Sequence, residues 1–84
     1  MPYMAIKDFV KLKLSEVKVD CNIEDDTLLI EDEILDSLSI LYLIGELEKE
    51  YGITIPLADV IENNFGTLEM IEAYVKGRME NEKK

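Results

Sequence analysis

Apolar residues recur at helical intervals along most of the 84-residue chain. The strongest pattern lies between Asp36 and Tyr51, where residues at i, i+3, i+4 and i+7 define one apolar face. That face consists of Ile40, Leu43, Ile44, Leu47 and Tyr51. Gly52 and Pro56 come next, and they predict where this helix ends, because glycine favours a C-terminal cap and proline prevents continuation.

Two other segments have similar spacing and predict helices at either end of the chain. In the first, from Tyr3 to Lys18 and preceded by Pro2, the stripe is Ile6, Phe9, Val10, Leu14 and Val17. In the second, Thr67 precedes a stripe of Leu68, Ile71, Tyr74, Val75 and Met79 and is expected to cap the helix.

Shorter features lie between the second and third of these helices. Leu57 to Asn63 predicts a short helix, and residues 63–66 predict a turn in which Phe65 plugs the core. No segment shows sustained strand alternation. The sequence therefore predicts an all-α bundle of three main helices and one short helix, forming one domain over residues 1–84 with a frayed tail from residue 79. The expected core includes Ile44, Leu47, Tyr51, Ile55, Ile71 and Val75.

A long loop is predicted from Val19 to Leu35, where turn-forming and acidic residues follow one another. Its apolar residues are expected to fold back over the core as a lid: Leu28, Leu29, Ile30, Ile34 and Leu35. A loop of this length in so small a domain is usually functional.

Composition narrows the chemistry that is open to this chain. It has no histidine, which removes the usual general base near neutral pH and the commonest metal ligand. One cysteine, Cys21, cannot form an intramolecular disulfide, and no signal peptide is evident, so a cytoplasmic protein is expected. The longest apolar run, Ile40 to Ile44, is too short to span a bilayer. The protein is expected to be a monomer.

Charge is distributed unevenly. Between Asp20 and Val75 there are fifteen acidic residues and one base, Lys49, giving a net charge of −14 within a chain of net charge −10. Such a segment repels phosphates, which argues against a nucleic-acid partner. It would steer the protein toward basic patches on other proteins, or simply keep the surface solvated.

The chemistry of the chain is concentrated at Asp36-Ser37-Leu38, which opens the strongest helix after the long loop. The N–H groups and the dipole at a helix N-terminus favour a negative group, so a phosphodiester on Ser37 would be stabilised there. Asp36 can cap the helix and offer a carboxylate where a modifying enzyme holds a metal ion. Taken alone, the triplet is equally typical of an ordinary N-cap.

In its wider context, the triplet resembles the phosphopantetheine-dependent carrier family. The resemblance runs through Ile34-Leu35-Asp36-Ser37-Leu38 to Tyr51-Gly52-Ile53-x-Ile55-Pro56 and then Phe65-Gly66-Thr67-Leu68. It implies a protein that is not an enzyme. In this family the serine is the substrate of a phosphopantetheinyl transferase, and the 4′-phosphopantetheine arm carries acyl or aminoacyl groups as thioesters.

The resemblance also implies partners. They are the transferase, an acyl- or aminoacyl-activating ligase, and acyltransferase or synthase enzymes with basic docking patches. Leu38 adjoins the attachment site, and Leu38, Leu41, Tyr42, Glu46 and Glu48 are the expected docking residues. Alternatively, the stripe of Leu38, Leu41 and Gly45 packs under the loop.

Departures from the family pattern bear on the pathway. Glu33-Ile34-Leu35 stands where the family often has glycine, and Ser39 and Tyr42 stand where fatty-acid carriers usually have acids. The spacing from Pro56 to Thr67 is similar to that of D-alanyl carriers of teichoic acid synthesis and of free-standing carriers in specialised pathways. A specialised or cell-envelope pathway is therefore expected, with D-alanyl transfer as an alternative.

Other classes of function remain as alternatives. Asp20, Asn22, Glu24, Asp26 and Glu31 match several ligand positions of a calcium-binding loop, although the sixth position lacks the required glycine. A helical interaction module without a prosthetic group is also compatible with the pattern. A hydrolase using Ser37 is disfavoured, because the chain has no histidine to activate it.

Overall fold

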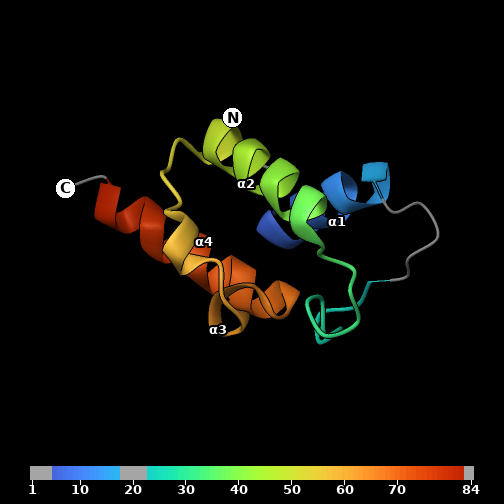
Figure 1. Cartoon of the computed structure of the whole chain (residues 1–84). Coiled ribbons are helices and arrows are strands. Elements are labelled where there is room, and N and C mark those ends of the chain that lie inside the picture. The colour runs from blue at the N-terminus through green and yellow to red at the C-terminus, as the bar shows by residue number, and fades with distance from the viewer. Residues whose placement is uncertain (1–4, 18–22, 83–84) are drawn as a thin grey trace.

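The computed structural model describes residues 5–17 and 23–82, and every regular element within them is helical (Figure 1). The elements are α1 (Ile6–Val17), α2 (Ser37–Tyr51), the 3₁₀ helix η1 (Leu57–Asp59), α3 (Glu62–Phe65) and α4 (Leu68–Glu82). The predicted all-α bundle is thereby confirmed. No helix among these residues has the length and apolar character needed to cross a membrane.

The core forms where α1, α2 and α4 turn their apolar stripes toward one another. All six residues predicted for it are buried. On α1, Ile6, Phe9, Val10 and Leu14 are buried as predicted, whereas Val17 at the end of the helix is 43% exposed. Aromatic rings from α1 and α2 also pack together in this core: Phe9 lies edge-on against Tyr51, with 5.5 Å between the ring centroids.

Both ends of α2 follow from local chemistry. At its start, the Asp36 carboxylate accepts a hydrogen bond from the Ser39 N–H at 2.9 Å. At its end, Gly52 adopts φ 65°, a left-handed conformation that glycine reaches without a Cβ penalty, and its N–H donates to Glu48 O. The predicted caps of this helix are therefore confirmed.

The connection between α2 and α4 differs from the prediction. The short helix expected over residues 57–63 is a single 3₁₀ turn, and the expected turn over residues 63–66 is largely α3. Ile61 is extended and half-exposed, whereas Phe65 is 1% exposed and packs 5.3 Å from the Tyr74 ring. Phe65 was predicted to fill the core, and its burial is favourable. This burial favours the observed register of α3, in which Phe65 is the last residue of the helix.

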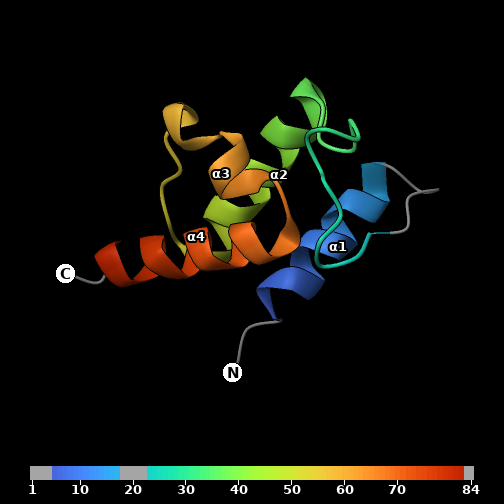
Figure 2. The same cartoon turned by 90° about the horizontal axis from the view of Figure 1, so that it is seen from below.

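The loop after α1 returns to the junction of α3 and α4, as Figure 2 shows. There the Leu29 N–H donates to Gly66 O at 2.8 Å. A Cβ on Gly66 would lie 2.5 Å from Glu62 O, so this close turn requires glycine. The lid prediction holds in part, because Leu29 and Leu35 are buried while Leu28 is 46% exposed.

Two further predictions concern the edges of the described structure. The tail was predicted to fray from residue 79, and the structure describes α4 as far as Glu82. Part of the calcium-binding alternative, Asp20 and Asn22, lies outside the described residues, as do Pro2, Tyr3, Lys18 and Cys21. Glu24 and Thr27 form a closed local turn, in which the Glu24 N–H donates to the Thr27 hydroxyl and the Thr27 N–H donates to Glu24 O.

Candidate functional site

Ser37 is the first residue of α2 and is exposed to solvent. Asp36 precedes it in an extended conformation, with φ −94° and ψ −176°, and uses its Oδ1 atom to hold the N–H of Ser39. In the first turn of a helix, N–H groups lack intrahelical acceptors and the helix dipole is positive. The chain thus presents a primary hydroxyl at a position that stabilises an attached anion.

The turn that leads into Ser37 contains an unusual backbone conformation. Glu33 has φ 59°, and within residues 5–17 and 23–82 it is the only non-glycine residue with a positive φ. The turn is held by hydrogen bonds from Glu33 N to Ile30 O and from Leu35 N to Leu29 O. The structure therefore makes the turn without the glycine that the family often has.

Replacing Glu33 with glycine is expected to raise the free energy of unfolding by roughly 0.5–1 kcal/mol. A left-handed conformation costs a non-glycine residue roughly 1–2 kcal/mol, and glycine removes this cost. Part of the resulting gain in stability is lost, because glycine has a greater conformational entropy in the unfolded chain. Urea denaturation measures the change. Asp32→Gly is the matched control, since it also removes one negative charge but at a residue with negative φ; equal effects in the two variants would contradict the prediction.

The outer surface of α2 begins immediately after Ser37. Leu38 is 80% exposed and Leu41 is 57% exposed, and Gly45 is also exposed. The alternative that this stripe packs under the loop is therefore wrong. Such neighbouring exposed apolar side chains are typical of a surface that other proteins contact.

Tyr42 and Glu46, two of the expected docking residues, turn toward α1. The Tyr42 hydroxyl donates to Glu16 Oε1, and Lys13 Nζ lies 3.3 Å from Glu46 Oε1. The hydrogen bond to Glu16, together with burial and the charges of Glu16 and Glu46, raises the pKa of Tyr42 to about 12. Tyr42 is therefore a neutral donor at physiological pH, and Glu46 already has a cationic partner.

Glu48 lies on a different side of α2 from Tyr42 and Glu46, and it contacts the segment that follows the helix. Its Oε2 atom accepts a hydrogen bond at 2.8 Å from the N–H of Ile55, in the segment that follows the Gly52 turn. Ser39 is 4% exposed, so it lies inside the bundle rather than on the surface where a fatty-acid carrier would present an acid. Glu46 and Glu48, the two acids among the expected docking residues, thus both have contacts within the chain.

A polar pair joins the connection between α2 and α4 to the last helix. The Tyr74 hydroxyl donates to Asp59 Oδ2 at 2.6 Å, and Arg78 Nε donates to Thr54 O at 2.9 Å. Burial, followed by the bond to Asp59, raises the pKa of Tyr74 to about 12. These contacts hold the Pro56 region in place at the end of α2 remote from Ser37.

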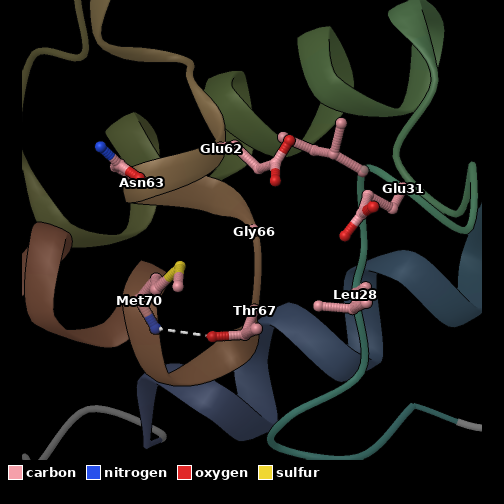
Figure 3. Close-up of a pocket in the computed structure, with 8 residues that line it drawn as sticks. Leu28, Glu31, Glu62, Asn63, Gly66, Thr67 and Met70 are labelled. Atoms are coloured by element: carbon pink, nitrogen blue, oxygen red, sulfur yellow. Dashed lines mark hydrogen bonds between the residues drawn. The ribbon is translucent and has the colours of Figure 1, made fainter.

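The described residues form two hollows, and one of them adjoins Ser37. An open groove beside Ser37 is lined by Val17, Asp36, Leu38, Ser39 and Tyr42. Figure 3 shows the second, a pocket of about 70 Å³ between the loop at Leu28 and Glu31 and the α3–α4 junction, where the Thr67 hydroxyl accepts from Met70 N. The sequence analysis did not predict either hollow. The spacing of the apolar residues that line them does not differ from the spacing of apolar residues in the core.

Comparison with protein families agrees with this geometry. The profile described as "Phosphopantetheine attachment site" matches residues 6–75, which extends from the start of α1 into α4 and includes Ser37. A comparison with curated proteins returned no match. The exposed hydroxyl at a capped helix N-terminus fits a phosphodiester-linked arm, and the chain contains no histidine that could make Ser37 a nucleophile of its own.

Proposed function

Because this chain belongs to the phosphopantetheine attachment family, whose members are carriers and not catalysts, we propose that it holds acyl or aminoacyl groups on an arm attached to Ser37. The observation that carries this assignment of the residue is the exposed Ser37 hydroxyl at the first position of α2, directly after the Asp36 cap. The 4′-phosphopantetheine group supplies a terminal thiol, which forms thioesters with the cargo.

The residues around Ser37 have separate tasks in this proposal. Asp36 holds the first turn of α2 in place, so that the helix dipole favours the phosphate on Ser37. Asp36 is exposed and Leu38 is 80% exposed, so both leave Ser37 open to a phosphopantetheinyl transferase. Since no catalytic group of the chain is required, the partner enzymes supply all of the chemistry.

The proposed partners beyond the transferase are an acyl- or aminoacyl-activating ligase and a downstream acyltransferase or synthase in the cytoplasm. We favour a specialised or cell-envelope pathway, including D-alanyl transfer, over fatty-acid synthesis. Two observations support this: the first turn of α2 contains no acid, and Glu46 and Glu48 are used in contacts within the chain. Comparing loading by a D-alanine-activating ligase with malonyl transfer tests this part of the proposal.

Ser37→Ala is expected to abolish modification completely. The apo protein is incubated with coenzyme A and a broad-specificity phosphopantetheinyl transferase, and its intact mass is measured. The wild type should gain one phosphopantetheine group. Ser15→Ala is the control, because Ser15 is another exposed serine, on α1, and should not affect loading. An unmodified wild type under conditions that load a known carrier, or a modified Ser37→Ala variant, would refute the assignment.

A further inference from the structure

The groove beside Ser37 lies between the end of α1 and the start of α2, two helices that Figure 1 shows next to each other. This α1–α2 groove has a volume of about 360 Å³ and is lined by Val17, Asp36, Leu38, Ser39 and Tyr42. The residues on both sides of Ser37 in the chain are thus part of its lining. A flexible group attached to the Ser37 hydroxyl therefore begins at the edge of this groove.

The lining of the groove combines apolar surface with a fixed polar atom. Val17 is 43% exposed and Leu38 is 80% exposed. Tyr42 is half-buried, and its hydroxyl donates to Glu16 Oε1, which holds the ring against α1. A hydroxyl that donates one hydrogen bond still has lone pairs, so the Tyr42 oxygen can accept a hydrogen bond from an N–H group.

The chemical groups of the arm match this lining. Beyond its phosphate, 4′-phosphopantetheine carries a geminal dimethyl group, then two amides with N–H donors, and finally the thiol. The dimethyl group suits the apolar side chains and the tyrosine ring, and an amide N–H suits the phenolic oxygen. A carboxylate at position 42, which fatty-acid carriers usually have, would offer an acceptor but no apolar surface. The match therefore depends on Tyr42.

The other hollow is a poorer place for the arm. The pocket between the loop and the α3–α4 junction has a volume of about 70 Å³, against about 360 Å³ for the α1–α2 groove. Its lining begins at Leu28 on one side and ends at Met70 on the other, and it includes no residue adjacent to Ser37 in the chain. Size and position both favour the α1–α2 groove.

We propose that the phosphopantetheine arm on Ser37 rests in the α1–α2 groove between its visits to partner enzymes. Its dimethyl group packs against Val17, Leu38 and the Tyr42 ring, and one of its amide N–H groups donates to the Tyr42 oxygen. This inference rests on the proposed function and adds a binding site for the arm on the carrier itself. Weak contacts suffice for a tethered group: at an effective concentration of about 3 mM, a Kd of about 1 mM keeps it bound about three-quarters of the time.

NMR can observe the contacts between the arm and the groove directly. The protein is isotope-labelled and loaded by the transferase from unlabelled coenzyme A, so that isotope-filtered spectra show only contacts between arm and protein. The methyl protons of the arm are expected to give nuclear Overhauser effects to the Val17 methyl groups and the Tyr42 ring. Val17 is on α1, far from the attachment residue in the chain, so its signal reports a contact in space. Effects to Leu28 or Met70 instead, or none beyond residues 36–38, would overturn the proposal.

A pair of tyrosine variants gives an independent measurement. Binding of the arm in the groove should raise the Tm of the loaded wild type over the apo protein by roughly 3–6 °C. Tyr42→Phe keeps the ring but removes the accepting oxygen, and should make this difference smaller by about 2 °C or more. Tyr74→Phe is the matched control, since it also removes a hydroxyl that binds a carboxylate, that of Asp59, and should change the difference by less than about 1 °C. The phosphate stabilises the N-terminus of α2 equally in all three proteins, so it does not affect the comparison.

The outcomes separate this inference from the proposed function. If the wild type is loaded but Tyr42→Phe and Tyr74→Phe change the Tm difference equally, the groove site is wrong while the carrier assignment stands. The same conclusion follows if the loaded wild type shows no contact between the arm and Val17. Failure to load the wild type would remove the proposed function, and the groove site with it.

Discussion

Replacing Phe65 with alanine is expected to lower the free energy of unfolding by about 3–5 kcal/mol. Phe65 is 1% exposed and lies against Tyr74, so the substitution removes a complete aromatic side chain from the core and leaves a cavity. Native domains are stable by only about 5–15 kcal/mol, so this variant should be partly unfolded under mild conditions. Urea denaturation at 25 °C measures the loss.

Ile61→Ala is the control for Phe65→Ala. Ile61 precedes α3 by one residue and is 48% exposed, so its truncation should cost less than about 1 kcal/mol. The pair tests the register of α3, which the sequence did not predict. A loss at Ile61 that equals or exceeds the loss at Phe65 would show that this segment packs in a different register.

Leu47→Ala is expected to lower the free energy of unfolding by about 2–5 kcal/mol. Leu47 is fully buried at the centre of the face that α2 turns toward α1 and α4, and alanine would leave a cavity there. Chemical denaturation with circular dichroism as the probe gives the change. Because an unfolded carrier cannot present Ser37 on a helix, loading by the transferase should also fall at temperatures where the variant is unfolded.

The same substitution on the other side of the helix provides the comparison. Leu41→Ala removes the same atoms from α2 at a position that is 57% exposed, and should change stability by no more than about 0.5 kcal/mol. If Leu47→Ala also stays below that value, the orientation of α2 described here is wrong. If Leu41→Ala proves as costly as Leu47→Ala, the outer face is covered in solution.

Local patterns determined the main helices. The spacing of Leu43, Ile44 and Leu47 specifies which side of α2 is buried, since residues three and four apart share a face whatever lies opposite. The ends of α2 depend on Asp36 and Gly52, whose effects operate within a few residues of chain. For these reasons the three main helices, the caps of α2 and the six core residues could all be predicted from the sequence.

The signals that point to Ser37 were equally local. The prediction that Ser37 is the attachment residue rests on its neighbours Asp36 and Leu38 and on the resemblance to the carrier family, and the family match over residues 6–75 includes this residue. No long-range contact is needed to place a serine at the start of a helix. The cargo and pathway do not follow from such local signals, because partner enzymes select them.

Tertiary structure decided which polar and apolar residues of α2 are free for a partner. Glu46 and Glu48 look alike in sequence, but Lys13 from α1 pairs with one and the Ile55 N–H binds the other. Leu38 and Leu41 share a helix face that the loop could have covered, but the loop returns to Gly66 and both leucines are exposed. Periodicity groups residues on one side of a helix, whereas segments distant in the chain decide what covers that side.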